Sequence, residues 1–558
     1  MPKPWSSVWD PRIPMVFQPR DSLLQYFKDN VRATPGKVAL SFYGYDMTYR
    51  ELSQAIDRFA GGLSNLGVRK GDRVALFMQN CPQFVISYFG ALQAGAIIVA
   101  LNPMFKSAEL EYEINDSGAG TLVALDYLYP EIKRAEGRIR LKNVILTSPK
   151  DYLPEKPGLP LPPEMEQPEK TFPEALGFLD FLKKSPVEAA SRVGDLKEDI
   201  ALLQYTGGTT GLPKGAVITH YTLAHNAAAV PLWFGYTGDD VHTGVMPFFH
   251  VAGMVHSMCA ALVSGGRLVI LARFSPEVLA RAIEKYRCTV LNTITTMYTA
   301  LLDWPETGQY DLSSLRLVWE GGAPLPAAAE ERLKRLLPGA FVGEGYGLTE
   351  TLTGGVNTPI PYRKPGYIGI PFLSTDIKIV DLETGSKELK PGEEGEVVIK
   401  GPCVMKGYWN KPEDTEKQLK GGWLYTGDIG KMDEEGFLAI VSRKKELIKC
   451  SGFSVFPSEI EGLLYKHPAI AEVSVIGVPD PYRGETPKAF VVLRPEYRGK
   501  TREEDILDWA KDNMASYKRP RILEFRDELP KSGAGKVLRR VLVEEEAAKT
   551  HRTTIRKK

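Results

Sequence analysis

The chain has 558 residues, and its 70 lysine and arginine residues nearly balance its 69 aspartate and glutamate residues, giving a formal charge of +1. Such a balance provides no overall field for binding nucleic acid or an anionic membrane. A charged fraction of 25% and a hydrophobic fraction of 43% are typical of a folded globular protein, and the length predicts at least two domains.

Cysteine usage and the N-terminus indicate a protein of the reducing cytoplasm. The five cysteines lie far apart and form no Cys-x-x-Cys pair, which argues against a disulfide framework and a zinc site. The first residues lack the apolar core of a signal peptide. Residues 84–101 are almost entirely apolar, but Gly90 and Gly95 divide them. We therefore expect a buried helix followed by a buried strand there, and no transmembrane segment.

Helical and strand-like patterns alternate from about residue 50 to residue 350. The clearest elements are helices at 254–263, 277–286 and 326–337 and strands at 267–271, 289–294, 315–319 and 341–342. The strands are continuous apolar runs, which predicts a mainly parallel sheet covered by helices on both faces. The expected fold class is therefore α/β, with a large N-terminal domain of layered α/β sheets.

The pattern changes twice in the second half of the chain. From about 366 to 442, short alternating strands and tight turns predict a small β subdomain with no helix between its hairpins. Residues 443–558 then show an α+β pattern, with helices near 457–465 and 502–512 and strands near 472–476, 488–493 and 522–525. We predict an N-terminal domain over 1–442 and a mobile α+β lid domain over 443–558.

The most informative stretch is the glycine- and threonine-rich loop at 205–215, between strand-like runs at 200–205 and 216–219. Glycines let backbone N–H groups face one anion, threonine hydroxyls add donors, and Lys214 adds positive charge, so the loop suits a triphosphate. It is not the P-loop of common NTPases, because Leu and Pro follow Gly211 where that motif needs Lys and Ser/Thr. The structural alternative is a simple turn.

The loop closely resembles the phosphate-binding signature of the adenylate-forming superfamily, which includes acyl-CoA synthetases, luciferases and the adenylation domains of peptide synthetases. The resemblance is closest to fatty-acyl-CoA ligases, and it covers roughly residues 20 to 545. The superfamily's other signatures are matched in the expected order, at 47–52, 93–96, 247–253, 320–325, 346–350, 423–428, 443–449 and 536.

This resemblance implies a nucleotide site. Tyr346 would stack on adenine, Thr349 would meet the phosphate, and Glu350 would hold Mg²⁺, which needs few carboxylates beside phosphate oxygens and water. The other nucleotide contacts implied are Thr206, Gly207, Gly208, Thr209, Thr210, Lys214, Gly321, Gly322, Ala323, Asp428 and Arg443. A tight strand-to-helix turn is the alternative for the Gly-Gly segment, and surface ion pairs are the alternatives for Asp428 and Arg443.

Lys536 is the strongest candidate for direct catalysis with Thr349 and Glu350, because a carboxylate attacking the α-phosphate brings two anions together. The resemblance implies two steps that use ATP, Mg²⁺ and coenzyme A. Lys536 promotes acyl-adenylate formation, and the C-terminal domain then rotates about a hinge at Lys445 to admit coenzyme A. Lys449, Gly452 and Phe453 would line the thiol channel.

The resemblance places the acid pocket at residues 247–254, where amino-acid-activating relatives use an aspartate to bind the ammonium group of the substrate. This segment contains no carboxylate, so the resemblance disfavours an amino acid substrate. The implied substrate-binding residues are His250, Val251, Gly253 and Trp319. His250 either orients the acid or is a satisfied core histidine, and Trp319 either borders the acyl tunnel or belongs to the core.

We therefore predict an ATP-dependent ligase that joins a medium- or long-chain fatty acid to coenzyme A. The alternatives are a ligase of another acid such as an aryl acid, an enzyme that loads a carrier protein, and a nucleotide sensor without catalysis. The presence of both Lys536 and Glu350 disfavours the sensor. Peripheral membrane contact and the choice between monomer and homodimer stay open.

Overall fold

The computed structural model describes residues 3–206, 212–322, 325, 327–450, 453–532 and 537–555. Contacts divide the chain into two compact units, one formed by Met1–Asp376 with Ile399–Leu424 and the other by Ile377–Val398 with Tyr425–Lys558. The boundary predicted at 442/443 falls inside the second unit and stays a prediction.

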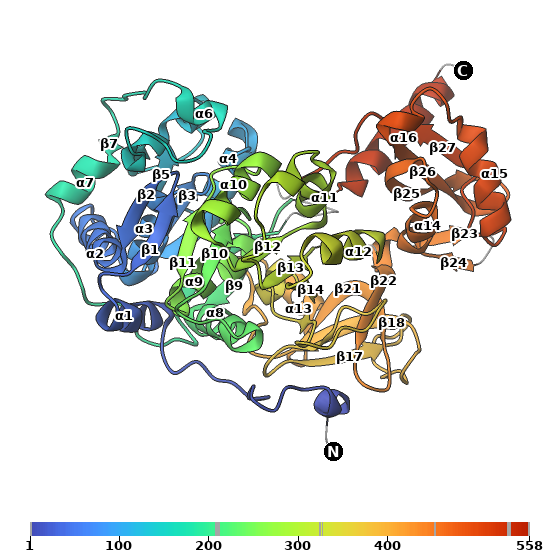
Figure 1. Cartoon of the computed structure of the whole chain (residues 1–558), viewed down its shortest axis with the longest axis horizontal. Helices are drawn as coiled ribbons and strands as arrows, with labels where there is room; N and C mark the ends of the chain where they lie inside the picture. Colours follow the sequence, from blue (N-terminus) through green and yellow to red (C-terminus); the bar gives the residue numbers. More distant parts are fainter. Residues whose placement is uncertain are drawn as a thin grey trace. The chain divides into compact units, whose positions relative to one another are not determined.

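A nine-stranded sheet forms one half of the first unit (Figure 1). Its central strands pair in parallel, and β2, β15 and β16 add antiparallel edges. In spatial order the strands are β16 (Ile370–Pro371), β15 (Val356–Asn357), β14 (Phe341–Tyr346), β13 (Leu317–Gly321), β12 (Val290–Thr293), β10 (Val241–Gly244), β11 (Arg267–Ile270), β1 (Val38–Phe42) and β2 (Tyr45–Thr48).

An eight-stranded sheet forms the other half. Strands β8, β4, β3, β5, β6 and β7 pair in parallel, while β9 joins β8 and β19 joins β9 in antiparallel fashion. The order is β19 (Gly407–Tyr408), β9 (Gly215–Thr219), β8 (Ile200–Tyr205), β4 (Ile97–Ala100), β3 (Arg73–Phe77), β5 (Thr121–Leu125), β6 (Asn143–Thr147) and β7 (Leu176–Gly177). The expected α/β class and the mainly parallel pairing are confirmed.

Helices link the two sheets. Helices α2 and α3 contact each other, α2 against β1 and β2 and α3 against β3 and β4, while α8 contacts β8 and β9 and also meets α9. These helices are α1 (Leu23–Ala33), α2 (Tyr49–Asn65), α3 (Pro82–Gln93), α8 (His220–Phe234) and α9 (Ala260–Val263). Every residue of α3 and β4 is buried, as expected for residues 84–101. In the part of the chain that the structure describes, the helices are too short or too polar to cross a bilayer.

The predicted helix at 254–263 is present in a different form. It starts as a π-helix over Gly253–Cys259 and becomes α-helical only in α9. π-Helical turns are rare and often mark functional sites. Further α-helices of this unit are α4 (Ser107–Ser117), α5 (Tyr129–Arg134), α6 (Pro163–Glu166), α7 (Phe178–Lys184), α10 (Pro276–Tyr286), α11 (Thr295–Asp303) and α12 (Ala327–Leu336).

The small β region forms a five-stranded sheet in the order β17-β18-β21-β20, with β22 beside β21. The strands are β17 (Asp376–Val380), β18 (Gly395–Lys400), β20 (Leu419–Lys420), β21 (Trp423–Met432) and β22 (Leu438–Arg443). The expectation of no helix here is wrong, because α13 spans Pro412–Gln418. Proline at its first turn and acidic residues after it favour a helix start, but α13 buries none of its residues and so shows no apolar period.

The C-terminal half of the second unit is built on a sheet in the order β24-β23-β26-β25, with β27 beside β26. Its strands are β23 (Ile448–Cys450), β24 (Phe453–Val455), β25 (Ile470–Asp480), β26 (Gly484–Leu493) and β27 (Ile522–Phe525), and its helices are α14 (Pro457–Leu464), α15 (Glu503–Asn513) and α16 (Arg539–Ile555). Helix α16 was not anticipated. Its residue Glu546 pairs with the buried Lys488 of β26 at 2.8 Å, which ties the helix to the sheet.

Candidate active site

The candidate phosphate loop closes an antiparallel hairpin. Tyr205 at the end of β8 pairs with Gly215 at the start of β9. The Thr206 N–H donates to the Lys214 carbonyl at 3.0 Å, and the Lys214 N–H donates to the Thr206 hydroxyl at 3.4 Å. The structure therefore brings Thr206 and Lys214 together at the base of the loop. The predicted contacts at the loop tip lie outside the described residues: Gly207, Gly208, Thr209 and Thr210.

Helix α4 holds the base of this loop from one side. The Tyr205 hydroxyl donates to Asp116 at 2.7 Å, and the Tyr112 hydroxyl donates to the Pro213 carbonyl, also at 2.7 Å. Burial and the hydrogen bond to Asp116 raise the pKa of Tyr205, so its hydroxyl remains a donor at neutral pH. Helix α4 thus holds the chain on both sides of the loop, at Tyr205 and at Pro213.

Lys214 is held by two side chains, Tyr408 of β19 and Asp414 of α13. Its ammonium forms an ion pair with Asp414 at 2.6 Å and lies 5.2 Å from the centroid of the Tyr408 ring. The hydrogen bond from Lys214 lowers the pKa of Asp414, so the carboxylate stays charged. Neither Tyr408 nor Asp414 was found from the sequence, because no charge pattern there points to position 214.

Glu350 and Thr349 lie in a single 3₁₀ turn, Thr349–Thr351, that follows β14. The Tyr408 hydroxyl donates to Glu350 Oε1 at 2.8 Å, and the Met405 N–H donates to the Glu350 carbonyl at 2.8 Å. Among the described residues, no group of three His, Cys, Asp or Glu side chains could hold a metal. A single carboxylate beside a nucleotide suits Mg²⁺, which takes its other oxygens from phosphate and water.

The predicted adenine contacts lie at the ends of two neighbouring strands. Gly321 ends β13, Tyr346 ends the parallel strand β14, and the register pairs Gly321 with Gly345. Gly322 has φ +89°, a conformation that favours glycine, so the chain turns sharply there. Ligands of open α/β sheets bind outside the carboxyl ends of the strands. The structure therefore places Gly321, Gly322 and Tyr346 together, while Ala323 lies outside the described residues.

A buried carboxyl next to this turn was missed. Glu320 has 1% of its surface exposed, and its Oε2 accepts a hydrogen bond from the Thr295 hydroxyl at 3.1 Å. Burial, with a smaller contribution from Glu344, raises the pKa of Glu320 well above its usual value. The raised pKa favours the uncharged form of Glu320, which precedes the turn at Gly321 and Gly322.

Trp319 is a packed side chain with 3% of its surface exposed. Its indole N–H donates to Asn357 Oδ1 at 3.0 Å, and its ring stacks on His256 with centroids 4.1 Å apart and 14° between planes. A Cβ on Gly345 would lie 2.2 Å from the indole, so this glycine makes room for the ring. Trp319 thus fills the space beside the ends of β13 and β14. Its stacking partner His256 was not identified from the sequence.

The predicted acid-pocket residues lie at the start of the π-helix. His250 is half-buried, and its Nδ1 accepts a hydrogen bond from the Ala252 N–H at 3.3 Å. Val251 is buried, and a Cβ on Gly253 would lie 2.2 Å from the Pro247 carbonyl oxygen. His250 is thus oriented by the backbone and is not a fully buried core histidine.

The predicted ribose residues face each other in the second unit. Asp428 and Arg443 are register partners on β21 and β22, and Arg443 Nε donates to Asp428 Oδ1 at 3.0 Å. Asp428 has 3% of its surface exposed, so the pair is not a simple surface ion pair. Their contact with a nucleotide stays a prediction.

The remaining predicted residues also belong to the second unit. Lys445 lies in the turn Lys444–Glu446 and Lys449 in β23, where its N–H donates to Glu485 at 2.7 Å. Phe453 begins β24. Gly452 and Lys536 lie outside the described residues, and the hinge, channel and catalytic roles of these residues stay predictions.

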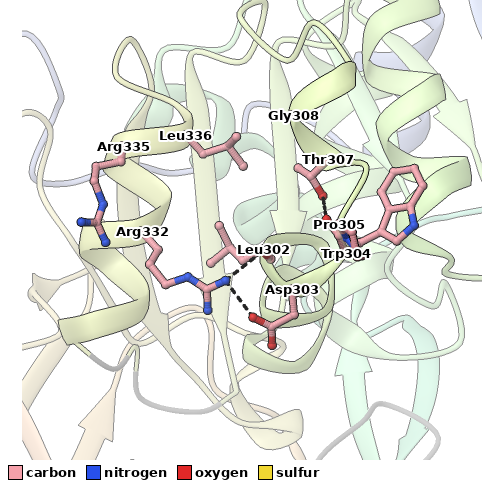
Figure 2. A pocket seen from close by; sticks show the side chains of 9 residues that line it. All are labelled: Leu302, Asp303, Trp304, Pro305, Thr307, Gly308, Arg332, Arg335 and Leu336. Carbon is pink, nitrogen blue, oxygen red and sulfur yellow. Dashed lines mark hydrogen bonds and ion pairs between the residues drawn. The ribbon is translucent and has the colours of Figure 1, made fainter. Parts of the chain in front are cut away.

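An open hollow of about 470 Å³ lies between α11 and α12 (Figure 2). Arg332 crosses it and donates to the Leu302 carbonyl at 2.8 Å and to Asp303 at 2.7 Å. Its lining contains none of the predicted site residues: it consists of Leu302, Asp303, Trp304, Pro305, Thr307, Gly308, Arg332, Arg335 and Leu336.

Comparison with known proteins agrees with this arrangement. A family model described as AMP-binding enzyme matches residues 27–409, and one described as AMP-binding enzyme C-terminal domain matches residues 459–536. The chain belongs to the AMP-binding enzyme family. A long-chain-fatty-acid–CoA ligase of Bacillus subtilis is 40% identical over 98% of this chain and 99% of its own length. The predicted resemblance is confirmed.

Two solved structures share the fold of this chain. The ATP-bound MatB of Rhodopseudomonas palustris is 30% identical with a TM-score of 0.82, and the match covers 94% of this chain and 98% of MatB. The anthranilate CoA ligase AuaEII in complex with anthranoyl-AMP is 28% identical with a TM-score of 0.84, covering 96% of this chain and 98% of its own.

Proposed function

We propose that this AMP-binding enzyme is an acid–thiol ligase that joins a medium- or long-chain fatty acid to coenzyme A. In the first step a carboxylate oxygen of the acid attacks the α-phosphorus of ATP, and the bond to pyrophosphate breaks. In the second step the sulfur of coenzyme A attacks the acyl carbonyl, its proton leaves to solvent, and the bond to AMP breaks.

The observation that carries the proposal is the convergence of Lys214 and Glu350. They come from loops far apart in the sequence, yet both contact Tyr408. A cation and a carboxylate beside one another suit a nucleotide that arrives with a divalent ion. When bound, Mg²⁺ would neutralise phosphate charge, with Glu350 as its protein ligand. The ATP-bound MatB structure supports the choice of nucleotide.

The choice of acid is supported by the pocket segment and by a relative. Residues 247–254 carry no carboxylate, and Val251 and Gly253 in this segment are buried. A segment without a charge of its own suits an acid that is polar only at its carboxylate. The Bacillus subtilis relative, matched over nearly its full length, is named for long-chain fatty acids. The anthranilate ligase makes an aryl acid the second candidate.

We further infer that Lys536 supplies positive charge at the α-phosphate and that Lys445 is the hinge for coenzyme A entry. One contact described in the second unit supports this coupling. Arg539, at the start of α16 and three residues after Lys536, forms ion pairs with Glu446 beside Lys445 and with Glu461. The hinge segment and the chain that follows Lys536 are thus tied together.

The first experiment measures pyrophosphate release with acids from acetate to palmitate and with aryl acids, with and without coenzyme A. We expect the fastest release with medium- or long-chain acids, and acyl-CoA and AMP when coenzyme A is present. Faster turnover of aryl acids would favour the second candidate. Release that continues without thioester formation would point to a carrier protein as the acceptor, and no release with any acid would contradict the proposal.

The second experiment tests Lys536 with a matched control. Lys536→Ala should slow adenylate formation about 100- to 1,000-fold, because one preorganised charge at the transition state is lost. Lys531→Ala removes a nearby exposed lysine that pairs with Glu472 at 2.7 Å and should change the rate less than about twofold. Equal rates for the two variants would exclude Lys536 from the chemistry.

A further inference from the structure

Residues 405–414, which we call the joining segment, contact both loops of the candidate nucleotide site. Within it, β19 pairs with β9, so that Tyr408 is the register partner of Ala216 just after Lys214. The Trp409 N–H donates to the Gly215 carbonyl at 2.8 Å, and the Met405 N–H donates to the Glu350 carbonyl at 2.8 Å. The backbone of this segment therefore fixes where its side chains lie relative to Lys214 and Glu350.

Tyr408 is the side chain of this segment that touches both charged groups. Its hydroxyl donates to Glu350 Oε1 at 2.8 Å, while its ring lies 5.2 Å from Lys214 Nζ. A phenol is protonated at neutral pH, and a carboxylate can only accept, so the Tyr408 hydroxyl is the donor in this hydrogen bond. The Tyr408 side chain thus contacts both groups: its hydroxyl orients the Glu350 carboxylate, and its ring lies beneath the Lys214 ammonium.

The two carboxylate oxygens of Glu350 have different surroundings. Oε1 is occupied by the phenol, and Oε2 makes no hydrogen bond or ion pair with the residues that the structure describes. A glutamate has three side-chain torsions, and an unrestrained carboxylate would lose that freedom on binding a cation. A hydrogen bond that is already made to one oxygen removes much of this cost and directs the other oxygen.

We propose that Tyr408 is a positioning residue that acts through Glu350, presenting Oε2 to the divalent cation of a bound nucleotide. The identity of the ligand in this proposal, a nucleotide with a divalent cation, rests on the proposed function. It follows that removing the phenol hydroxyl should weaken cation binding while leaving the fold intact, because the ring and the β19–β9 pairing remain. Outer-shell partners of metal ligands typically change metal affinity about 10- to 100-fold.

The test measures Mn²⁺ binding to the full-length protein saturated with a non-hydrolysable ATP analogue, by electron paramagnetic resonance of free Mn²⁺. Tyr408→Phe should raise the dissociation constant for Mn²⁺ about 10-fold. The matched control is Tyr49→Phe in α2, which removes another hydroxyl hydrogen bond, 2.8 Å to the Gly266 carbonyl, and should leave the dissociation constant unchanged within about twofold. Thermal unfolding of all variants checks the fold.

A double-mutant cycle separates positioning from a general structural effect. In a Glu350→Gln background the cation ligand is already weakened, so adding Tyr408→Phe should cost less than about twofold further. An equal 10-fold loss in both backgrounds, or wild-type affinity in Tyr408→Phe, would overturn the proposal. A different result would reject the proposed function and not the role of Tyr408: wild-type protein that binds the analogue and Mn²⁺ but releases no pyrophosphate with any acid.

Discussion

The two sides of the candidate site use opposite chemistry. On the nucleotide side, Lys214, Asp414, Glu350 and Tyr408 are half-buried and joined by an ion pair and a charged hydrogen bond. Around Trp319, the neighbours are uncharged and almost fully buried, and burial lowers the pKa of His256 to about 3. The charged side chains thus lie where a polyphosphate would bind, whereas the buried surroundings of Trp319 contain uncharged side chains.

This difference separates groups that act on a ligand from groups that hold the fold. Exposed ion pairs contribute little to stability, whereas a large buried aromatic ring contributes much. Substitutions on the nucleotide side should therefore change activity with little change in stability. Substitutions around Trp319 should change stability first. The predictions below test this contrast, from the largest expected effect to the smallest.

Trp319→Ala should lower the free energy of unfolding by about 3–5 kcal/mol, because it leaves a cavity beside Gly345 and removes the stack on His256. Urea denaturation measures the change. Trp304→Ala is the control: this half-exposed tryptophan stacks on Tyr310 with centroids 5.4 Å apart, and its loss should cost about 1 kcal/mol. Similar losses for both variants would contradict a structural role for the interior stack.

Glu350→Gln should reduce pyrophosphate release about 100-fold, roughly 2.7 kcal/mol of transition-state stabilisation, since the amide is a poor ligand for a divalent cation. The half-buried position should keep the unfolding free energy within about 0.5 kcal/mol of wild type. Glu413→Gln removes an exposed carboxylate from α13 and should leave the rate unchanged. A stable Glu350→Gln protein with full activity would sink the metal-ligand role.

Acid should destabilise the first unit through its buried histidines. Burial lowers the pKa of His256 to about 3 and that of both His220 and His242 to about 4. The unfolded chain protonates them near pH 6.5 while the native state does not. Each histidine therefore makes the unfolding free energy fall as pH drops from about 6.5 towards 4, by up to about 1.4 kcal/mol per pH unit.

Removing one of these histidines should flatten this pH dependence. His256→Gln should reduce the slope of unfolding free energy against pH by up to about 1.4 kcal/mol per pH unit between pH 6.5 and 4.5, compared by urea denaturation across that range. His467→Gln is the control, because His467 is only partly buried and packs against Trp509 in the second unit. A slope unchanged by His256→Gln would mean that this ring is protonated in the native protein.

Asp414→Asn should have the smallest effect on stability. The Lys214–Asp414 pair is 2.6 Å long, but about a third of each side chain is exposed, at 34% and 35%. Solvent screens such a pair, so the unfolding free energy should fall by about 0.5 kcal/mol at low salt, and by less in 1 M NaCl. A loss above about 1.5 kcal/mol that salt does not reduce would show that this side also holds the fold.

Much of the fold and part of the site could be predicted from the sequence. Continuous apolar runs predicted the parallel strands, and the hairpin around the phosphate loop is present with Thr206 and Lys214 at its base. Helix α13 was missed because it buries no residue and so has no apolar period. The helix expected at 254–263 starts as a π-helix at Gly253–Cys259, and the sequence could not indicate this form because every residue of the π-helix is buried and no apolar period marks it.

The missing site residues have a common physical reason. Tyr408 reaches Glu350, 58 residues earlier, only because β19 pairs with β9. His256 meets Trp319 through packing across two elements. Neither contact leaves a local pattern, since a tyrosine or a histidine next to apolar residues is ordinary in any core. The sequence motifs identified the charged residues of the loops. The side chains that contact and orient the predicted residues, such as Tyr408 and His256, could be found only from the three-dimensional structure.

One isotope measurement tests the central claim, that the acid is activated as an acyl-adenylate, most directly. Palmitate labelled with ¹⁸O in both carboxylate oxygens is incubated with the protein, ATP, Mg²⁺ and coenzyme A, and the AMP is examined by mass spectrometry. If the carboxylate attacks the α-phosphorus, AMP carries one ¹⁸O atom when the thioester forms. Unlabelled AMP, or label in ADP or inorganic phosphate, would contradict the account.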